Sequence, residues 1–353
     1  MTTLNEIITT AINAGSSDIH LSTRRPASCR VNGKLFTMDN ELLTNGDLEK
    51  MVQPFMQIKG VREKIEGLGE ADFAYSFNES TRFRVNMFKQ KGEYAVVMRL
   101  LPTKMPNPEE LGLPEAVRNF VNLKRGLVLV TGETGSGKST TLAALINRIN
   151  ETQQKHIITI EDPIEFVHQH KMSLVNQREI GIDTMSFASA LRASLREDPD
   201  IVLVGEMRDL ETIETALTAA ETGHLVFSTL HTNSAASTID RIIDVFPTGQ
   251  QDQVRVQLAS VLEGIVCQQL LPLREGNGRV ASFEVMVANS AIRNLVREGK
   301  SFQLTSQIQT GRKQGMQTMD DCLFKLFDQK KIFAEDAVRF AFDQANMAKL
   351  CQL

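Results

Sequence analysis

The stretch from 126 to 145 constrains the fold of this chain more than any other. An apolar run over 126–131 precedes Gly132-Glu133-Thr134-Gly135-Ser136-Gly137-Lys138-Ser139, and a helical pattern begins at Thr140. This is the pattern G-x-x-x-x-G-K-[ST] between a strand and a helix, the context that identifies a phosphate-binding loop. Its glycines permit backbone conformations that turn several N–H groups inward, and the helix N-terminus adds partial positive charge. The stretch therefore predicts a site for nucleotide phosphates.

The chemistry of this loop assigns roles to its residues. Lys138 is expected to reach the β and γ phosphates, and the Ser139 hydroxyl to join the Mg²⁺ shell. The predicted cofactors are ATP and Mg²⁺. The predicted nucleotide-binding set consists of Gly132, Thr134, Gly135, Ser136, Gly137, Lys138, Ser139 and Thr140.

Length and composition are typical of a globular protein with two domains. The chain has 353 residues, of which 42% are hydrophobic and 23% are charged. Domains typically hold about 100 to 200 residues. No apolar run approaches the roughly 18 residues that a membrane span needs, and the polar N-terminus carries no signal-peptide pattern. We therefore expect a cytoplasmic protein without a transmembrane segment.

Charge and cysteine usage argue against two other classes of protein. The formal net charge is −4, which argues against direct nucleic-acid binding as a global property. The 4 cysteines include no C-x-x-C pair, which argues against a disulfide framework and against a structural zinc site.

The first hundred residues predict a small α+β domain. A helix is expected over 4–14, and an Asn32-Gly33 turn indicates a hairpin. Further helices are expected over 49–56 and 61–66. Shorter strands are expected at 18–22, 29–31 and 34–36, and two longer strands at 81–90 and 93–101.

Two arginines stand out in the last two strands of this region. Arg84 alternates with apolar residues, so it points away from the face that packs. Arg99 lies within an otherwise apolar strand, where an unpaired buried charge would cost several kcal/mol. Either it extends to solvent at an edge, or its guanidinium leaves the small domain to reach phosphate.

A proline-rich segment marks the domain boundary. Prolines at 102, 106, 108 and 114 predict a stiff, extended connection. The predicted domains are therefore 1–101 and 116–353, joined by a linker over 102–115.

From 113 onward the sequence alternates between strand and helix patterns, which is typical of a parallel sheet with crossover helices. Strands are predicted at 126–131, 156–161, 201–205 and 225–230. Helices are predicted at 140–150, 187–197 and 210–222. Such sheets bind ligands beyond the carboxyl ends of their strands, so the residues that follow each strand are candidates for the site.

Acidic and imidazole groups follow three of these strands. The second strand leads into Glu161, Asp162 and Glu165, the third ends with Glu206, and the fourth ends with His231. Because all these ends lie on one edge of a parallel sheet, we expect the groups within reach of the γ phosphate. Hydrolysis needs such an assembly of metal, carboxylate and polar sensor.

The candidate catalytic roles are these. Glu206 is assigned to the metal and its water, although Gly205 stands where an aspartate is usual. Glu165 is the first choice to position the attacking water, with Glu161 and Asp162 as alternates. His231 is the candidate sensor of the leaving group.

His224 is a second histidine of the fourth strand. It begins that strand, about 23 Å from His231 at roughly 3.3 Å per residue, so both cannot touch one phosphate. One of the two is therefore expected to face a neighbouring subunit.

Three long segments resemble the motifs of the secretion and type IV pilus ATPases. The segment 158–166 resembles their aspartate box, 195–209 their Walker B segment, and 222–232 their histidine box. Within that family the chain most resembles the retraction ATPases of twitching motility. It has no tetracysteine loop and no large extra N-terminal domain, and Ala291-Ile292-Arg293-Asn294-Leu295 matches a C-terminal motif associated with retraction.

The resemblance implies a PAS-like N-terminal domain, a RecA-like P-loop ATPase core with C-terminal helices from about 285, and a homohexamer with nucleotide sites between subunits. It places Arg84 and Arg99 where the family has arginines that reach across to the phosphates. Arg208 and Arg241 are weaker candidates, for interface or sensor roles. The Ala291–Leu295 stretch also fits an ordinary amphipathic helix, with Ser290 as its cap and Gly299 as its end.

The function implied is an ATP-hydrolysing motor that powers pilus retraction. Its expected partners are an inner-membrane pilus platform protein and other pilus motor ATPases, and its expected location is the cytoplasmic side of the inner membrane at the pilus base. Three alternatives remain: an accessory retraction ATPase, a DNA-uptake or conjugation motor, and a nucleotide-gated binding module that hardly turns over.

Overall fold

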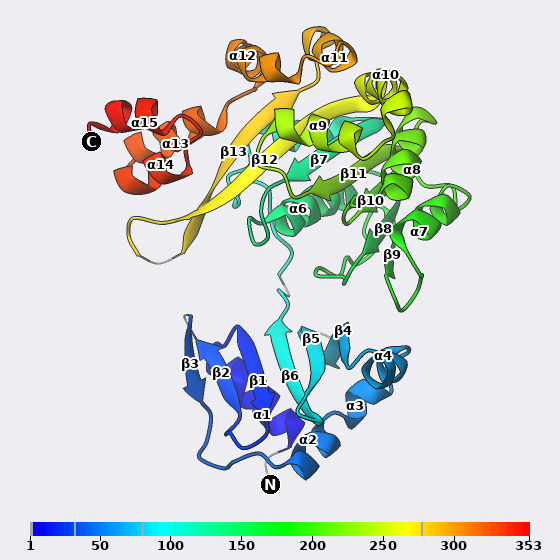
Figure 1. Cartoon of the computed structure of the whole chain (residues 1–353), viewed down its shortest axis with the longest axis vertical. Helices are drawn as coiled ribbons and strands as arrows, with labels where there is room; N and C mark the ends of the chain where they lie inside the picture. Colours follow the sequence, from blue (N-terminus) through cyan, green and yellow to red (C-terminus); the bar gives the residue numbers. More distant parts are fainter. Residues whose placement is uncertain (1–2, 32, 79–80, 103, 277) are drawn as a thin grey trace. The chain divides into compact units, whose positions relative to one another are not determined.

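The computed structural model describes residues 3–31, 33–78, 81–102, 104–276 and 278–353. Two compact units are present (Figure 1). The first consists of Met1–Lys104, Pro163–Val167 and Glu179–Asp183. The second consists of Met105–Asp162, His168–Arg178 and Thr184–Leu353. Of the predicted Asn32-Gly33 turn, Asn32 lies outside the described residues.

The first unit is built on an antiparallel sheet with the strand order β3-β2-β1-β6-β5-β4. Its strands are β1 (Asp18–Ser22), β2 (Ser28–Val31), β3 (Lys34–Thr37), β4 (Glu70–Asn78), β5 (Thr81–Gln90) and β6 (Glu93–Leu100). Its helices are α1 (Leu4–Asn13), α2 (Asn45–Met51), α3 (Gln53–Met56) and α4 (Val61–Gly67). In β5, Phe83, Val85 and Met87 are buried in the core, as the alternation predicts. The α+β architecture predicted for this region is confirmed.

Two features of the first unit differ from the prediction. Strand β4 was not predicted, although Ala71, Phe73, Tyr75 and Phe77 alternate along it and pack in the core. The single helix expected over 49–56 is two helices. A capping box at Thr44 starts α2 before residue 49. A proline at the start of α3 has no N–H to donate to the preceding turn, so a new helix begins there.

The second unit contains a largely parallel sheet with the strand order β13-β12-β7-β11-β10-β8-β9. Its strands are β7 (Gly126–Thr131), β8 (His156–Glu161), β9 (Leu174–Glu179), β10 (Ile201–Val204), β11 (Leu225–Leu230), β12 (Leu262–Pro272) and β13 (Arg279–Val287). Every residue of β7 is buried, as expected for a central parallel strand covered on both faces.

Helices cover this sheet and extend beyond it (Figure 1). They are α5 (Glu115–Asn119), α6 (Lys138–Thr152), α7 (Phe187–Ser194), α8 (Leu210–Glu221), α9 (Ala235–Asp244), α10 (Gln251–Val261), α11 (Ser290–Arg297), α12 (Leu304–Thr310), α13 (Met319–Asp328), α14 (Ala334–Phe340) and α15 (Gln344–Cys351). Short 3-10 helices are η1 (Phe120–Asn122), η2 (Thr248–Gln250), η3 (Ser301–Gln303) and η4 (Arg312–Gln314). Apolar residues of α5, η1 and α6 share one core with β7.

The four strands and three helices predicted for the second unit are confirmed, although α7 ends at Ser194 rather than 197. Strands β9, β12 and β13 were not predicted. Strand β12 carries the buried polar residue Gln268 among apolar neighbours, and it also has a register shift between Leu262 and Gly264. Both features interrupt the regular alternation from which a strand is inferred.

Helix α11 carries the Ala291–Leu295 stretch. Asn289, and not Ser290, caps this helix, because its Oδ1 accepts from the N–H of Ile292 at 2.9 Å. Arg293 donates to the carbonyl oxygen of Ala259 at 3.0 Å and pairs with Glu263 at 2.9 Å. In this chain the arginine of the stretch therefore anchors α11 to the end of α10.

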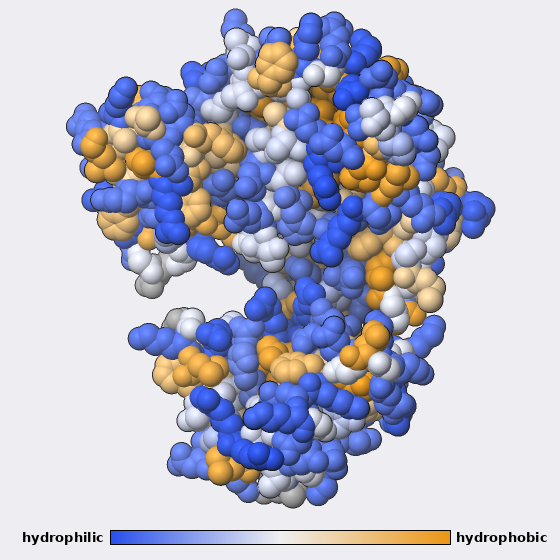
Figure 2. Space-filling view, in the orientation of Figure 1, coloured by the Kyte–Doolittle hydropathy of each residue, from blue (hydrophilic) through white to orange (hydrophobic). Residues whose placement is uncertain are grey.

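The visible surface is mostly hydrophilic, and apolar residues occur on it in separate small areas (Figure 2). Among the described residues, none of the helices combines the length and the apolar character that crossing a bilayer requires.

Gly264 gives a test of the packing between β12 and η1. A Cβ at this position would lie 2.2 Å from Cζ of Phe120 and 3.1 Å from the carbonyl oxygen of Met286. We expect Gly264→Ala to lower the free energy of unfolding by about 1–3 kcal/mol through overpacking, measured by urea denaturation. Gly249→Ala is the control, since it points into open space, and Phe120→Leu should restore part of the loss. Equal stability of the two alanine variants would contradict this packing.

Candidate functional site

Parallel pairing brings the ends of four strands to one edge of the sheet in the second unit. Thr131 of β7 lies opposite Leu230 of β11, and Val204 of β10 lies between Ser228 of β11 and Ile160 of β8. The residues that follow these strands therefore begin at neighbouring points, as the sequence predicts.

Backbone hydrogen bonds continue past the strand ends. The N–H of Gly132 donates to the carbonyl oxygen of Leu230 at 3.3 Å, and the N–H of Gly205 donates to that of Ile160 at 2.8 Å. The N–H of Met207 donates to the carbonyl oxygen of Thr229 at 3.1 Å. The first residues of each loop are thereby held in register with the sheet.

The loop between β7 and α6 has the backbone conformation that its glycines predict. The φ angles of Gly132, Gly135 and Gly137 are 142°, 82° and 93°, which residues with a Cβ rarely adopt. Lys138 is buried, and its Nζ donates to the carbonyl oxygens of Gly132 at 2.7 Å and of Glu133 at 3.0 Å. The ammonium group of Lys138 is therefore bound by carbonyl oxygens at the start of the same loop.

The loop fits the phosphates of a nucleotide. Gly137 precedes α6 and has no side chain to cap it, which leaves the first N–H groups of this helix available to an anion. The buried hydroxyl oxygen of Ser136 has no hydrogen-bond partner within the described part of the chain. Donors of this kind, together with the ammonium group of Lys138, match the acceptor oxygens of phosphate.

Glu206 and His231 are brought together at this edge. The Nε2 atom of His231 lies 2.9 Å from Oε1 of Glu206, and the guanidinium of Arg208 pairs with the same carboxylate oxygen. The hydrogen bond to Glu206, together with the charge of Asp162, raises the pKa of Arg208. The structure therefore places Asp162 close enough to this cluster to act on it electrostatically.

Glu161 is held by two neutral side chains. Its Oε1 accepts from the hydroxyl of Thr159 at 2.7 Å and from Nε2 of Gln177 at 3.0 Å. The Oε1 of Gln177 in turn accepts from the backbone N–H of His168 at 2.7 Å. Gln177 was not among the predicted site residues, because it lies 16 positions from Glu161 in an unpredicted strand and no local pattern marks it.

Gly205 occupies the position where an aspartate is usual, and its surroundings account for this. A Cβ there would lie 3.1 Å from the carbonyl oxygen of Ile160, 3.4 Å from Cα of Glu161 and 3.5 Å from the ring of Phe187. The close approach of β8 and α7 therefore leaves little room for a side chain at 205.

For Glu165 and His224 the structure gives only the local positions. Glu165 belongs to Pro163–Val167, a segment of the first unit, so its role in positioning water stays a prediction. His224 lies at the opposite end of β11 from His231, and its Nδ1 is 3.0 Å from the carbonyl oxygen of Ala219. Its place at a subunit interface also stays a prediction.

Arg84 and Arg99 face each other across β5 and β6 of the first unit. Nε of Arg84 lies 3.2 Å from the carboxylate of Asp72, and Nε of Arg99 lies 2.9 Å from that of Asp18. The Arg99 side chain is 70% exposed, so it extends to solvent instead of being buried in its apolar strand.

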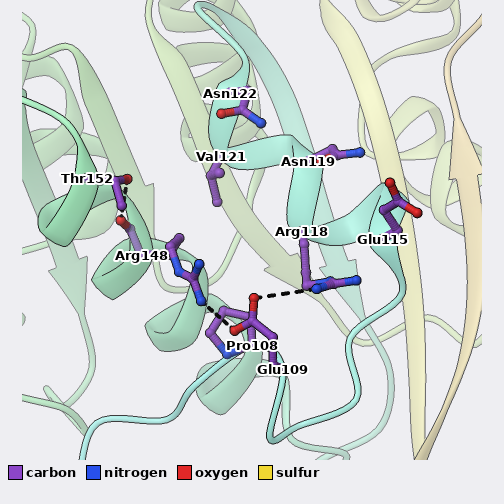
Figure 3. A pocket seen from close by; sticks show the side chains of 9 residues that line it. All are labelled: Pro108, Glu109, Glu115, Arg118, Asn119, Val121, Asn122, Arg148 and Thr152. Atoms are coloured by element: carbon purple, nitrogen blue, oxygen red, sulfur yellow. Dashed lines mark hydrogen bonds and ion pairs between the residues drawn. The ribbon is translucent and has the colours of Figure 1, made fainter.

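A cavity of about 420 Å³ lies at the other end of α6 from Lys138 (Figure 3). Glu109 bridges Arg118, at 3.4 Å, and Arg148 in its wall. None of the predicted site residues lines this cavity.

Comparison with known proteins identifies the class. The family model described as Type II/IV secretion system protein matches residues 1–335. The type IV pilus retraction ATPase PilT of Pseudomonas aeruginosa is 49% identical, over 95% of this chain and 96% of its own length. The type IV pilus ATPase PilU of the same organism is 40% identical, over 96% of this chain and 88% of its own.

A solved structure agrees with these matches. The crystal structure of the pilus retraction motor PilT with bound ADP superposes with a TM-score of 0.92 and 49% identity, covering 99% of this chain and 100% of that chain. The phosphate loop and the RecA-like sheet define a P-loop ATPase. The chain belongs to the Type II/IV secretion system protein family.

His168 gives a test of the loop that supports Glu161. It is 8% exposed, and burial lowers its pKa to about 4, below the ordinary value of 6.5. Because the folded state disfavours the charged imidazole, stability is lost as pH falls from 6.5 toward 4. We compare the free energy of unfolding of His168→Gln with that of wild type by urea denaturation at pH 7 and at pH 5. The difference should shift by about 2 kcal/mol in favour of the variant at the lower pH. Identical pH profiles for the two proteins would contradict a buried neutral His168.

Proposed function

We propose that this chain is a homohexameric, ATP-hydrolysing motor that powers retraction of type IV pili. The observation that carries the proposal is 49% identity to a retraction ATPase over 95% of this chain. The identity to the PilU relative is lower, at 40%, which favours the retraction motor over the accessory role.

ATP binding follows from the loop after β7. Lys138 exchanges the carbonyl oxygens of its own loop for phosphate oxygens, and the N–H groups at the start of α6 complete the cradle. Ser139 and Glu206 would hold Mg²⁺, Glu206 partly through water, and the ion would neutralise developing charge on the phosphates. The site thus combines a fixed anion cradle with one carboxylate across from it.

Hydrolysis needs a group that orients water. Glu165 is the first candidate, with Glu161 and Asp162 as alternates. Glu161 accepts hydrogen bonds from the uncharged side chains of Thr159 and Gln177, which hold its carboxylate in a fixed position. His231 is the sensor of the leaving group within reach of the γ phosphate, and its contact with Glu206 links that sensor to the metal ligand. Loss of the γ phosphate would therefore change the environment of both residues.

A neighbouring subunit supplies Arg84 and Arg99. Within one chain, Arg84 pairs with the partly exposed Asp72, and exposed pairs contribute only about 0–1 kcal/mol. The Arg99 side chain is exposed, but its partner Asp18 is buried. A triphosphate can compete for these guanidinium groups, and an arginine finger increases the rate by roughly 10³ to 10⁵. Movement of the small domain of one subunit against the large domain of another would transmit the work.

The work is delivered to an inner-membrane pilus platform protein, with the motor bound at the cytoplasmic side of the pilus base and acting beside other pilus motor ATPases. The relatives that carry pilus names support a role in the pilus system.

Turnover separates a motor from a nucleotide-gated binding module. We expect Lys138→Ala and Glu206→Ala to lower steady-state phosphate release by about 10²- to 10³-fold or more, because each removes charge stabilisation of the transferred phosphoryl group. Gly249→Ala, which points into open space, is the folded control. Negligible release by wild type and both variants would instead indicate a binding module.

The same variants test the biological role. In cells of the source organism, Lys138→Ala should leave pili assembled but unable to withdraw, scored by imaging labelled fibres. Normal withdrawal in those cells would contradict the retraction role.

A mixing experiment tests the arginines. Lys138→Ala and Arg99→Ala are each expected to be inactive, but co-assembled in equal amounts they should regain activity, since about a quarter of the interfaces then combine an intact loop with an intact arginine. Arg84→Ala is tested in the same way. Arg62→Ala, which alters an exposed pair with Glu66, is the control. If mixtures show no more activity than either variant alone, the arginines do not act between subunits.

A further inference from the structure

Gln268 is a buried polar residue that none of the functional assignments uses. It lies on β12, the strand beside β7, and is 4% exposed. An uncharged amide at such a position costs free energy unless its donor and acceptor are both satisfied. The contacts that satisfy it are therefore informative.

The nitrogen and the oxygen of the Gln268 side-chain amide both form hydrogen bonds, one to the phosphate loop and one to the helix that follows it. Nε2 donates to the carbonyl oxygen of Ser136 at 2.8 Å, and Oε1 accepts from the hydroxyl of Thr141 at 2.7 Å. A carbonyl oxygen can only accept, so the NH₂ group must face Ser136, and this determines which way the amide is turned.

The bond to Ser136 sets the direction of the next N–H group. The carbonyl of Ser136 and the N–H of Gly137 belong to one peptide unit, and in a planar trans unit they point in opposite directions. Drawing the carbonyl outward to β12 therefore turns the N–H of Gly137 toward the inside of the loop. Inward N–H groups are the donors with which such a loop holds phosphate.

Two glycines of the loop lie so close to Gln268 that a side chain at either position would collide with it. A Cβ at Gly132 would lie 2.3 Å from the carbonyl oxygen of Gln268, and a Cβ at Gly137 would lie 2.6 Å from its Nε2. The two glycines thus allow β12 to approach the loop from behind. Side chain and backbone of one residue form the wall against which the loop is shaped.

We propose that Gln268 is a positioning residue of the ATPase site: its side-chain amide holds the Ser136–Gly137 peptide in the orientation that binds nucleotide phosphate. It touches no nucleotide itself. The inference rests on the proposed role of the 132–139 loop in binding ATP.

The first test measures the affinity of the full-length protein for a fluorescent ADP in Mg²⁺ buffer. Gln268→Leu removes both hydrogen bonds at similar volume, and we expect affinity to fall about tenfold, as for loss of a buried hydrogen bond. The matched control is Gln269→Leu, because neighbouring residues of a strand point to opposite faces and Gln269 is less buried. Affinity of Gln268→Leu equal to that of the control would overturn the proposal.

A second variant distinguishes positioning from general packing. In Gln268→Glu, Oε1 can still accept from Thr141, but an ionised carboxylate would face the carbonyl of Ser136 without a proton to donate. Lowering the pH protonates it and restores a donor, so the deficit relative to wild type at the same pH should shrink from pH 9 to pH 6. A deficit that does not change with pH would overturn the proposal, even if Gln268→Leu fails to fold.

Lys138→Ala separates this inference from the assignment of the loop. If Lys138→Ala still binds ADP as wild type does, the loop assignment fails. If Lys138→Ala loses binding while Gln268→Leu and Gln268→Glu retain it, only the role of Gln268 fails.

Discussion

The parallel pairing of β7, β11, β10 and β8 is the constraint on which the site depends. These strands are buried, and their partners in register fix where each one ends. Because backbone hydrogen bonds continue past the ends, at Gly132, Gly205 and Met207, the first residues of the loops have little freedom. Catalytic groups attached to such a rigid edge need no reorganisation when charge develops, which is the main source of electrostatic catalysis.

Neutral amides support the charged groups at this edge. Gln177 holds Glu161 from one side, and Gln268 holds the phosphate loop from another. An amide donates and accepts at once, so it can link a carboxylate to a backbone N–H, or a carbonyl to a hydroxyl, without burying a further charge. Uncharged groups thereby orient Glu161 and the loop. Under the proposed function, the charges of Lys138, Glu206 and His231 would act on the nucleotide.

In the first unit, two neighbouring arginines each pair with a carboxylate. Arg84 and Arg99 lie side by side across β5 and β6, and the Arg99 side chain is largely exposed. The Arg84–Asp72 pair is partly exposed, whereas Arg99 pairs with the buried Asp18. A triphosphate has several charged oxygens and can bind a guanidinium through two hydrogen bonds. Under the proposed function, the same arginines would serve the site of a neighbouring subunit.

The sequence by itself determined the phosphate loop, four strands of the main sheet, and the acidic and imidazole residues that follow them, because these depend on local patterns of glycine and apolar residues. Only the tertiary structure revealed β9, β12 and β13 and the contacts of the Gln177 and Gln268 amides. Gln268 lies 132 positions from Ser136 and 127 from Thr141, so no local pattern records their contact. Hydrogen bonds between distant segments depend on strand order and register, which alternation of side chains does not specify.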